Sequence, residues 1–168
     1  MEDHHSVDRI RHMSGYWWLK WLHIVSSTVL FGTGFGIAFF FVRAHRTGNV
    51  DIIASVGRDV VLADAVFTAA AVIIQPASGV ALAFMAGFPL SSPWLLLSIA
   101  LYLVVGACWL PVVWLQIWMR NLAVAAAATS RPLPPEYKKY YRWWFALGWP
   151  AFIGVLAIFY LMVAKPQF

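Results

Sequence analysis

Charged side chains are scarce in this sequence. Asp, Glu, Lys and Arg make up 11% of the 168 residues, whereas hydrophobic residues make up 62% and aromatic residues 17%. A soluble globular domain has about a quarter of its residues charged and about half apolar. This composition excludes an ordinary soluble domain and indicates an integral membrane protein.

Cysteine is almost absent, because Cys108 is the single one in the chain. One cysteine excludes an intramolecular disulfide, and its position inside an apolar run is typical of a packing residue. No His, Cys and carboxylate cluster occurs at zinc-ligand spacing within the hydrophobic segments, and His4, His5 and His12 have no such framework near them. Zinc chemistry is therefore not supported, and we expect no specific metal site at the N-terminus.

Four hydrophobic segments are long enough to cross a bilayer, which takes about 20 helical residues at 1.5 Å each. We predict membrane spans at residues 19–42, 60–86, 94–119 and 143–164. We expect residues 1–15 to form a flexible polar tail and residues 16–168 to form a single all-α domain, a four-helix transmembrane bundle.

The connections between these spans differ in charge. The connection at residues 87–93 carries no Lys or Arg, whereas the connections at 43–59 and 120–142 carry Arg43, Arg46, Arg58, Arg120, Arg131, Lys138, Lys139 and Arg142. By the positive-inside rule, the two basic connections are cytoplasmic. This predicts a multi-pass protein of the bacterial inner (plasma) membrane with both termini outside. The net charge of +5 then serves topology and anionic lipid, so we expect no nucleic-acid partner.

One histidine lies inside the first span. His23 follows Trp18 by five residues, roughly 7 to 8 Å farther into the membrane than an aromatic pair expected at the interface. An ionisable group at that depth is costly unless it faces the protein interior and has a partner. Three explanations stay open: a hydrogen bond between helices, a proton relay, or coordination of a metal, for which haem iron is the common intramembrane case.

Polar and small residues share faces of the predicted helices. Lys20, His23 and Ser27 lie on one side of the first span, with Gly32 and Gly36 on a neighbouring side. In the second span, Asp64 lies about one turn inside the cytoplasmic end, where it could pair with Arg58 or Arg43, and Gln75 needs a hydrogen-bond partner. Similar stripes carry Thr68 and Gly79 in this span, and Ser98, Tyr102, Gly106, Trp109 and Gln116 in the third.

The stretch Trp18-Leu19-Lys20-Trp21-Leu22-His23-Ile24, with the later Phe41-Val42-Arg43-Ala44-His45, resembles the first helix of HemJ-type protoporphyrinogen oxidases, which are small membrane proteins that bind haem b. The likeness continues in order through residues 67–72, 79, 94, 97–101, 119–123 and 150–166. Residues 63–64, 75–79, 108–113 and 144–150 more closely resemble a bacterial family of small integral membrane proteins of unknown function.

The first resemblance implies that His23 matches the helix-one histidine associated with haem binding. This chain departs from that family at three places: Ser98 stands where the family has a lysine, Cys108-Trp109 where it has a histidine, and Gly148-Trp149 where it has a carboxylate. Such basic and acidic groups are suited to hold porphyrin carboxylates or move protons. The resemblance therefore implies haem retention rather than porphyrinogen oxidation.

We expect a haem b-binding membrane protein that acts in electron transfer or another redox reaction. His23 would coordinate the iron, with Met85 or Met162 as a second axial ligand, and Lys20 would neutralise a propionate beside Ser27. Gly32, Gly34 and Gly36 would leave room for the macrocycle. The alternative is a non-catalytic membrane subunit without a cofactor, which packs in a homo-oligomer or a larger complex within the lipid bilayer. A transporter is the third reading, without an inverted repeat to support it.

Overall fold

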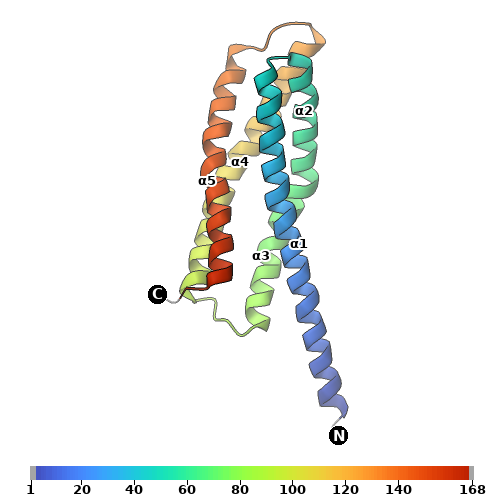
Figure 1. Ribbon diagram of the computed structural model, residues 1–168, viewed down its shortest axis with the longest axis vertical. Coiled ribbons are helices and arrows are strands. Elements are labelled where there is room, and N and C mark those ends of the chain that lie inside the picture. The colour runs from blue at the N-terminus through green and yellow to red at the C-terminus, as the bar shows by residue number, and fades with distance from the viewer. Residues whose placement is uncertain (1–2, 167–168) are drawn as a thin grey trace.

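Helices make up nearly all of this elongated molecule (Figure 1). The computed structural model describes the backbone of residues 3–166 and the side chains of residues 13–166. The chain runs through α1 (Asp3–Thr47), α2 (Val50–Ala63), η1 (Asp64–Thr68), α3 (Ala69–Met85), α4 (Pro93–Ala128) and α5 (Pro135–Ala164), and no strand occurs among the described residues. Four stretches are long and apolar enough to cross a membrane: Met13–Thr47, Val50–Met85, Pro93–Ala128 and Pro135–Ala164. The predicted all-α architecture with four spans is confirmed.

The helices extend beyond the predicted spans at the basic end. In place of the connection predicted at residues 43–59, only Gly48 and Asn49 separate α1 from α2. Gly48 has a φ of 65°, and the Asn49 side chain caps α2 by accepting hydrogen bonds from the backbone N–H groups of Asp51 (2.9 Å) and Ile52 (3.1 Å). Hydropathy indicates where a helix leaves the membrane, but it does not indicate where the helix itself ends. A 36-residue helix such as α4 is about 54 Å long, well beyond a hydrocarbon core of about 30 Å.

Helix α1 begins at Asp3, inside the segment that the sequence predicted as a tail. Extending an existing helix fixes one residue for each hydrogen bond gained, whereas starting a helix is costly, so a polar segment can continue a helix that the membrane span has begun. The side chains of His4, His5 and His12 lie outside those that the structure describes.

The second span contains one turn of a different kind. Residues Asp64–Thr68 form the π-helical turn η1, in which the backbone N–H of Ala69 bonds to the carbonyl of Asp64, five residues earlier. Single π turns inside α-helices often occur at functional sites. The span otherwise continues through Pro76, a residue type that can kink a helix.

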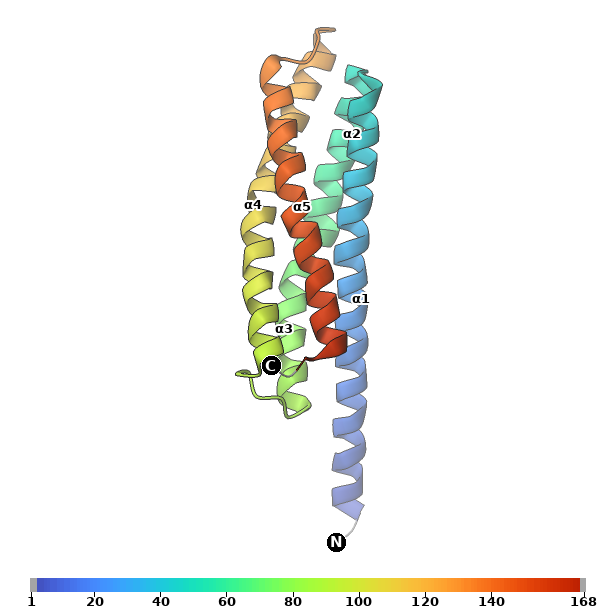
Figure 2. The same cartoon turned by 60° about the vertical axis from the view of Figure 1, so that its left-hand side comes forward.

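The helices pack unequally along the bundle. The α4 and α5 helices lie side by side, α2 packs against α4, and α1 packs against α2, η1 and α3 (Figures 1 and 2). The main core lies in the half that contains α2, where Phe41, Ile53, Met119 and Tyr137 are fully buried. A smaller core of Ala83, Trp94 and Leu95 lies near the α3–α4 connection.

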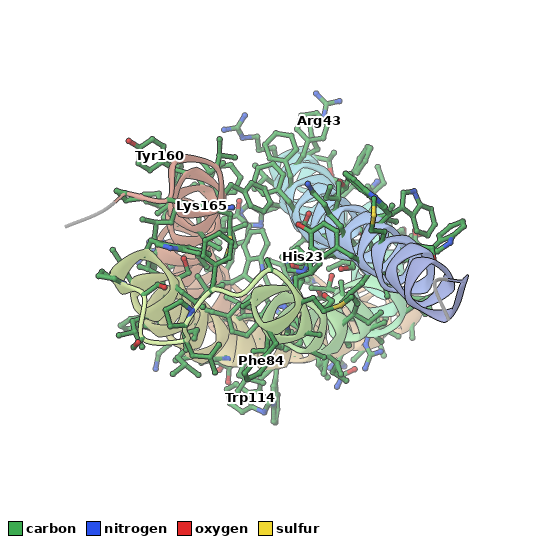
Figure 3. All side chains as sticks on the ribbon, turned by 90° about the horizontal axis from the view of Figure 1, so that it is seen from below. His23, Arg43, Phe84, Trp114, Tyr160 and Lys165 are labelled. Carbon is green, nitrogen blue, oxygen red and sulfur yellow. The ribbon has the colours of Figure 1, made fainter. Side chains whose placement is uncertain are left out.

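Many large apolar side chains point outward from the bundle, as Phe84, Trp114 and Tyr160 do in the end view of Figure 3. Val163 is 86% exposed and Ile73 is 71% exposed. On a soluble protein such a surface would be an aggregation liability, but on a membrane protein it contacts lipid acyl chains.

Candidate functional site

His23 joins α1 to α3 near the middle of the bundle's cross-section (Figure 3). Its Nδ1 lies 2.7 Å from the Oγ of Ser78, and that hydroxyl also lies 2.7 Å from the backbone carbonyl of Ile74, one turn earlier in α3. A serine hydroxyl has one proton to donate. With that proton on the Ile74 carbonyl, His23 Nδ1 carries a hydrogen and donates it to Ser78. In that tautomer the lone pair of the neutral imidazole lies on Nε2.

Two more side chains complete this junction. Gln75 Nε2 donates to the backbone carbonyl of His23 at 2.7 Å and to Ser26 Oγ at 2.5 Å. Ser26 and Ser78 are buried, at 5% and 4% exposure, and His23 is half-buried. We call His23, Ser26, Gln75 and Ser78 the His23 cluster. Gln75 thus has the partner that its depth in the membrane requires.

Gly79 sets how closely the imidazole approaches α3. A Cβ at this position would lie 3.2 Å from His23 Cε1, so the ring packs against the glycine backbone. Any larger side chain would press on the ring and displace it from Ser78. Gly79, which the sequence placed on the polar face of the second span, therefore leaves room for the His23 ring against α3.

The other residues proposed beside His23 lie apart from its ring. Lys20 is exposed, with its Nζ 5.4 Å from the Trp17 ring centre and 5.9 Å from that of Tyr16, an arrangement suited to the membrane interface. Ser27 Oγ donates to the carbonyl of Ile24 in its own helix at 2.7 Å. Ser27 therefore makes a local hydrogen bond, whereas its neighbour Ser26 makes the contact between helices.

Three of the glycines of α1, Gly32, Gly34 and Gly36, border open space. A Cβ added at Gly32, Gly34 or Gly36 would meet no atom within 4 Å outside its own helix turn. No described side chain of the protein therefore packs closely against these positions. Gly32 is nine residues from His23, about 14 Å along the helix axis, and the other two are farther.

Met85 and Met162, the two methionines expected as a second axial ligand, lie at the same end of the bundle as the α3–α4 connection. Met85 Cε lies 4.0 Å from the position that a Cβ would occupy at Gly15. Gly15 precedes His23 by eight residues, which is about 12 Å along α1. Met162 packs against the small core of Ala83, Trp94 and Leu95. The structure does not bring Met85 next to the imidazole.

A second polar group lies deeper in the main core. Asp64 is 4% exposed, and the Gln116 amide, in the orientation that gives each of its atoms a partner, donates to Asp64 Oδ2 at 2.7 Å and accepts from Trp144 Nε1 at 3.2 Å. Gln116 itself is 2% exposed. Asp64 was expected to pair with Arg58 or Arg43. Among residues 13–166 no arginine forms an ion pair with it, because its side chain points into the bundle while Arg58 and Arg43 are exposed.

The sequence identified His23, Gln75 and Gly79 but missed Ser26 and Ser78. Serine is common in membrane helices and usually bonds to a carbonyl of its own helix, as Ser27 and Thr28 do here. The one available signal was that Ser78 lies three residues after Gln75 and so on its side of the helix.

The donor set limits which metal site His23 could form. No group of three or more His, Cys, Asp or Glu residues suited to a metal ion occurs in the part of the chain that the structure describes. A metal at His23 would therefore need most of its ligands from a cofactor, as iron in haem has from the porphyrin nitrogens.

Comparisons with known proteins agree with the membrane architecture. A family model described as "Predicted integral membrane protein (DUF2269)" matches residues 17–166, which include three of the four membrane-spanning stretches and all but the first four residues of the other. No curated protein and no solved structure matches the chain.

Proposed function

This chain belongs to the DUF2269 family of predicted integral membrane proteins, and we propose that it binds haem b through His23 and takes part in a membrane redox reaction. The orientation of the imidazole carries the proposal. In the tautomer that carries the hydrogen on Nδ1, His23 donates to Ser78 Oγ at 2.7 Å and the Nε2 lone pair is available to a metal. Histidines that coordinate metals almost always donate their other ring hydrogen in this way, and the hydrogen bond sets the ring orientation and the ligand basicity.

The surroundings of His23 fit a haem ligand in two further respects. Gly79 admits the ring against α3, and the hydrogen bonds of Gln75 to His23 and Ser26 hold that part of α1 in place. Lys20, one turn from His23 at the aromatic interface, is suited to neutralise a propionate. We take His23 as the single protein ligand, because two ligands of one iron lie about 4–5 Å apart. The Met85 side chain lies beside Gly15, about 12 Å along α1 from His23, and Met162 packs against Ala83, Trp94 and Leu95.

The chain's residues would hold and tune the cofactor rather than carry out its chemistry. A bound haem supplies one-electron transfer, and its potential depends on the axial ligand and the hydrogen bond behind it. The likeness of α1 to HemJ-type oxidases supports haem. The position where that family has a lysine on its third helix is Ser98, which is 2% exposed and donates to the Trp94 carbonyl of its own helix at 2.7 Å. We therefore propose electron transfer and not porphyrinogen oxidation.

An absorption spectrum of the gently purified protein, oxidised and then reduced with dithionite, tests this function. We expect a stoichiometric b-type haem signal that His23→Ala removes. The matched control is His45→Ala, which deletes a half-buried histidine at the other end of α1 that stacks on Tyr141 at 3.6 Å, and it should leave the spectrum unchanged. A folded protein without haem, or equal haem content in His23→Ala, would contradict the proposal.

A second candidate function is a non-catalytic membrane subunit that packs against copies of itself or a larger complex. The observation that favours it is the open space beside Gly32 and Gly36, which are spaced by four and would admit a helix of another chain at close range. In that case the His23 cluster would serve only to hold α1 on α3. A colourless, folded protein that purifies as a stable oligomer would support this candidate.

We further propose that the protein lies in a bacterial inner membrane with both termini outside. The basic residues named for the two predicted cytoplasmic connections all lie at the end of the bundle where α1 meets α2 and α4 meets α5, which is the upper end in Figure 1. This concentration supports a cytoplasmic location for that end.

A further inference from the structure

Asp64 lies in the bundle where a carboxyl group is expensive. It is 4% exposed, it begins the π-helical turn η1, and Ala63 and Val60, which precede it in the chain, belong to or pack against the main core. Among residues 13–166, no Lys, Arg or His pairs with it. A buried carboxylate without a cation is costly in an apolar medium, and intramembrane acidic residues of this kind usually have a function. The proposed haem site does not use Asp64.

Three hydrogen-bonding groups face this carboxyl from two elements. Gln116 on α4 donates to Oδ2 at 2.7 Å, and its own amide oxygen is held by Trp144 Nε1 of α5 at 3.2 Å, which fixes the amide orientation. Thr68 of η1 and Trp109 of α4 lie beside the same carboxyl. Every one of these side chains can donate to an ionised Asp64.

Two of these groups are not used in the structure. Thr68 Oγ1 and Trp109 Nε1 are both buried beside the Asp64 carboxyl and make no hydrogen bond of normal geometry, and Thr68 is 4% exposed. Buried donors without partners are rare and need an explanation. A carboxyl that changes its charge explains them, since these donors would close on the oxygens when the group is ionised and relax when it is neutral.

We propose that Asp64 is an intramembrane proton-binding site, whose carboxyl takes up and releases a proton inside the bundle. The Thr68 hydroxyl suits both forms, because it can donate to the carboxylate and accept from the carboxylic acid. Gln116 and Trp109 can only donate through the groups that face Asp64, so they stabilise the ionised form. The nearest other charged groups of this span, Arg58 and Asp59 on α2, are exposed and five to six residues away, about 8–9 Å along the helix, and the exposed Asp51 is farther.

Two residues of the π turn share the carboxyl site. Asp64 and Thr68 are the two buried residues of the five in η1, and residues four apart lie on the same face of a helix. Such turns are usually retained where a local side-chain arrangement requires them. The inference is independent of haem, since it concerns a different cluster, closer to the basic end of the bundle than the His23 cluster.

Reaction with dicyclohexylcarbodiimide tests the proposal. This apolar reagent adds to a protonated carboxyl within a membrane and is retained as an N-acylurea, which peptide mass spectrometry locates. The full-length protein in lipid vesicles would be labelled over a range of pH. We expect Asp64 to be labelled at low pH and the labelling to fall as pH rises through a single titration. Asp64→Asn should remove this label while its haem spectrum and thermal unfolding stay those of the unmodified protein.

Variants of the surrounding groups separate proton binding from mere burial. Thr68→Val removes a donor to the ionised form, so the midpoint pH of labelling should rise by about one unit. Thr33→Val, a threonine on α1 outside this cluster, is the matched control and should leave the midpoint unchanged. The exposed carboxyls Asp51, Asp59 and Glu136 serve as labelling controls in the same sample.

Either of two results would overturn the proposal. Labelling of Asp64 that does not change with pH would show a permanently neutral, structural carboxylic acid. An Asp64 that is never labelled in vesicles, although it reacts in the unfolded protein, would show a group that does not take up a proton. Neither result would bear on haem binding, which the absorption spectrum measures separately.

Discussion

Ser78 is the residue on which the position of His23 depends. Ser78→Ala leaves the Nδ1 hydrogen of His23 without its acceptor. Hydrogen bonds between membrane helices contribute about 0.6 kcal/mol on average and up to about 1.7 kcal/mol. We expect a loss of about 1 kcal/mol in the free energy of unfolding, seen as a fall of about 2–4 °C in the melting temperature in detergent.

The same variant should also weaken haem retention. Loss of a hydrogen bond behind a metal ligand typically costs about 10- to 100-fold in affinity. Haem content per protein after dilution measures this effect. Ser27→Ala is the control, because Ser27 bonds within α1 and should change neither quantity. Full haem retention in Ser78→Ala would mean that another group orients the ring.

Residue types alone allowed His23 to be identified, because an ionisable side chain is conspicuous in an apolar helix. They did not identify Ser26, which differs from Ser27 only in the direction in which it points from α1. That direction matters only once α3 is placed against α1, and the choice between the two serines is therefore a tertiary one.

Helices α4 and α5 are the most tightly packed pair, and Gly154 lies at their contact. A Cβ at this position would lie 2.5 Å from Val105 Cγ2, a distance that real contacts do not allow. Gly154→Ala should therefore destabilise the protein by about 1–3 kcal/mol, measured as a lower melting temperature.

A second substitution tests the cause of that loss. Val105→Ala should restore most of the stability in the double variant, because it removes the methyl group that the new Cβ would meet. Gly148→Ala, in the same helix but facing open space, should be close to neutral. If the effects of Gly154→Ala and Val105→Ala on the melting temperature simply add in the double variant, the contact with Val105 is not the cause of the lost stability.

Helix ends differ from membrane boundaries in this protein. Helix α4 begins at Pro93, which follows Ser92 at the first helical position and lies one residue before the predicted span. The sequence missed the continuation of α1 to Thr47 and the start of α2 at Val50, because charged residues there were assigned to a loop. Charges outside the bilayer are compatible with a helix, so polarity by itself cannot locate these ends.

The whole molecule has one strongly basic end, and this predicts its orientation. In a Cys108→Ala background, Ser130→Cys lies between α4 and α5, and Ser91→Cys lies between α3 and α4. We expect an impermeant maleimide added to intact cells to label Cys at position 91 and not at position 130. In inverted membrane vesicles the labelling should be reversed. The opposite pattern would place the basic end outside.

Composition and hydropathy were sufficient to predict a membrane protein with four helical spans, because a chain that crosses lipid must satisfy its backbone hydrogen bonds within each helix. Local sequence therefore encodes the spans. The contacts of Ser78 with His23 and of Gln116 with Asp64 join residues far apart in the chain. Which polar side chains meet depends on how helices rotate against one another, and the π turn at Asp64 changes that rotation within a single span. These pairings were decided by tertiary packing.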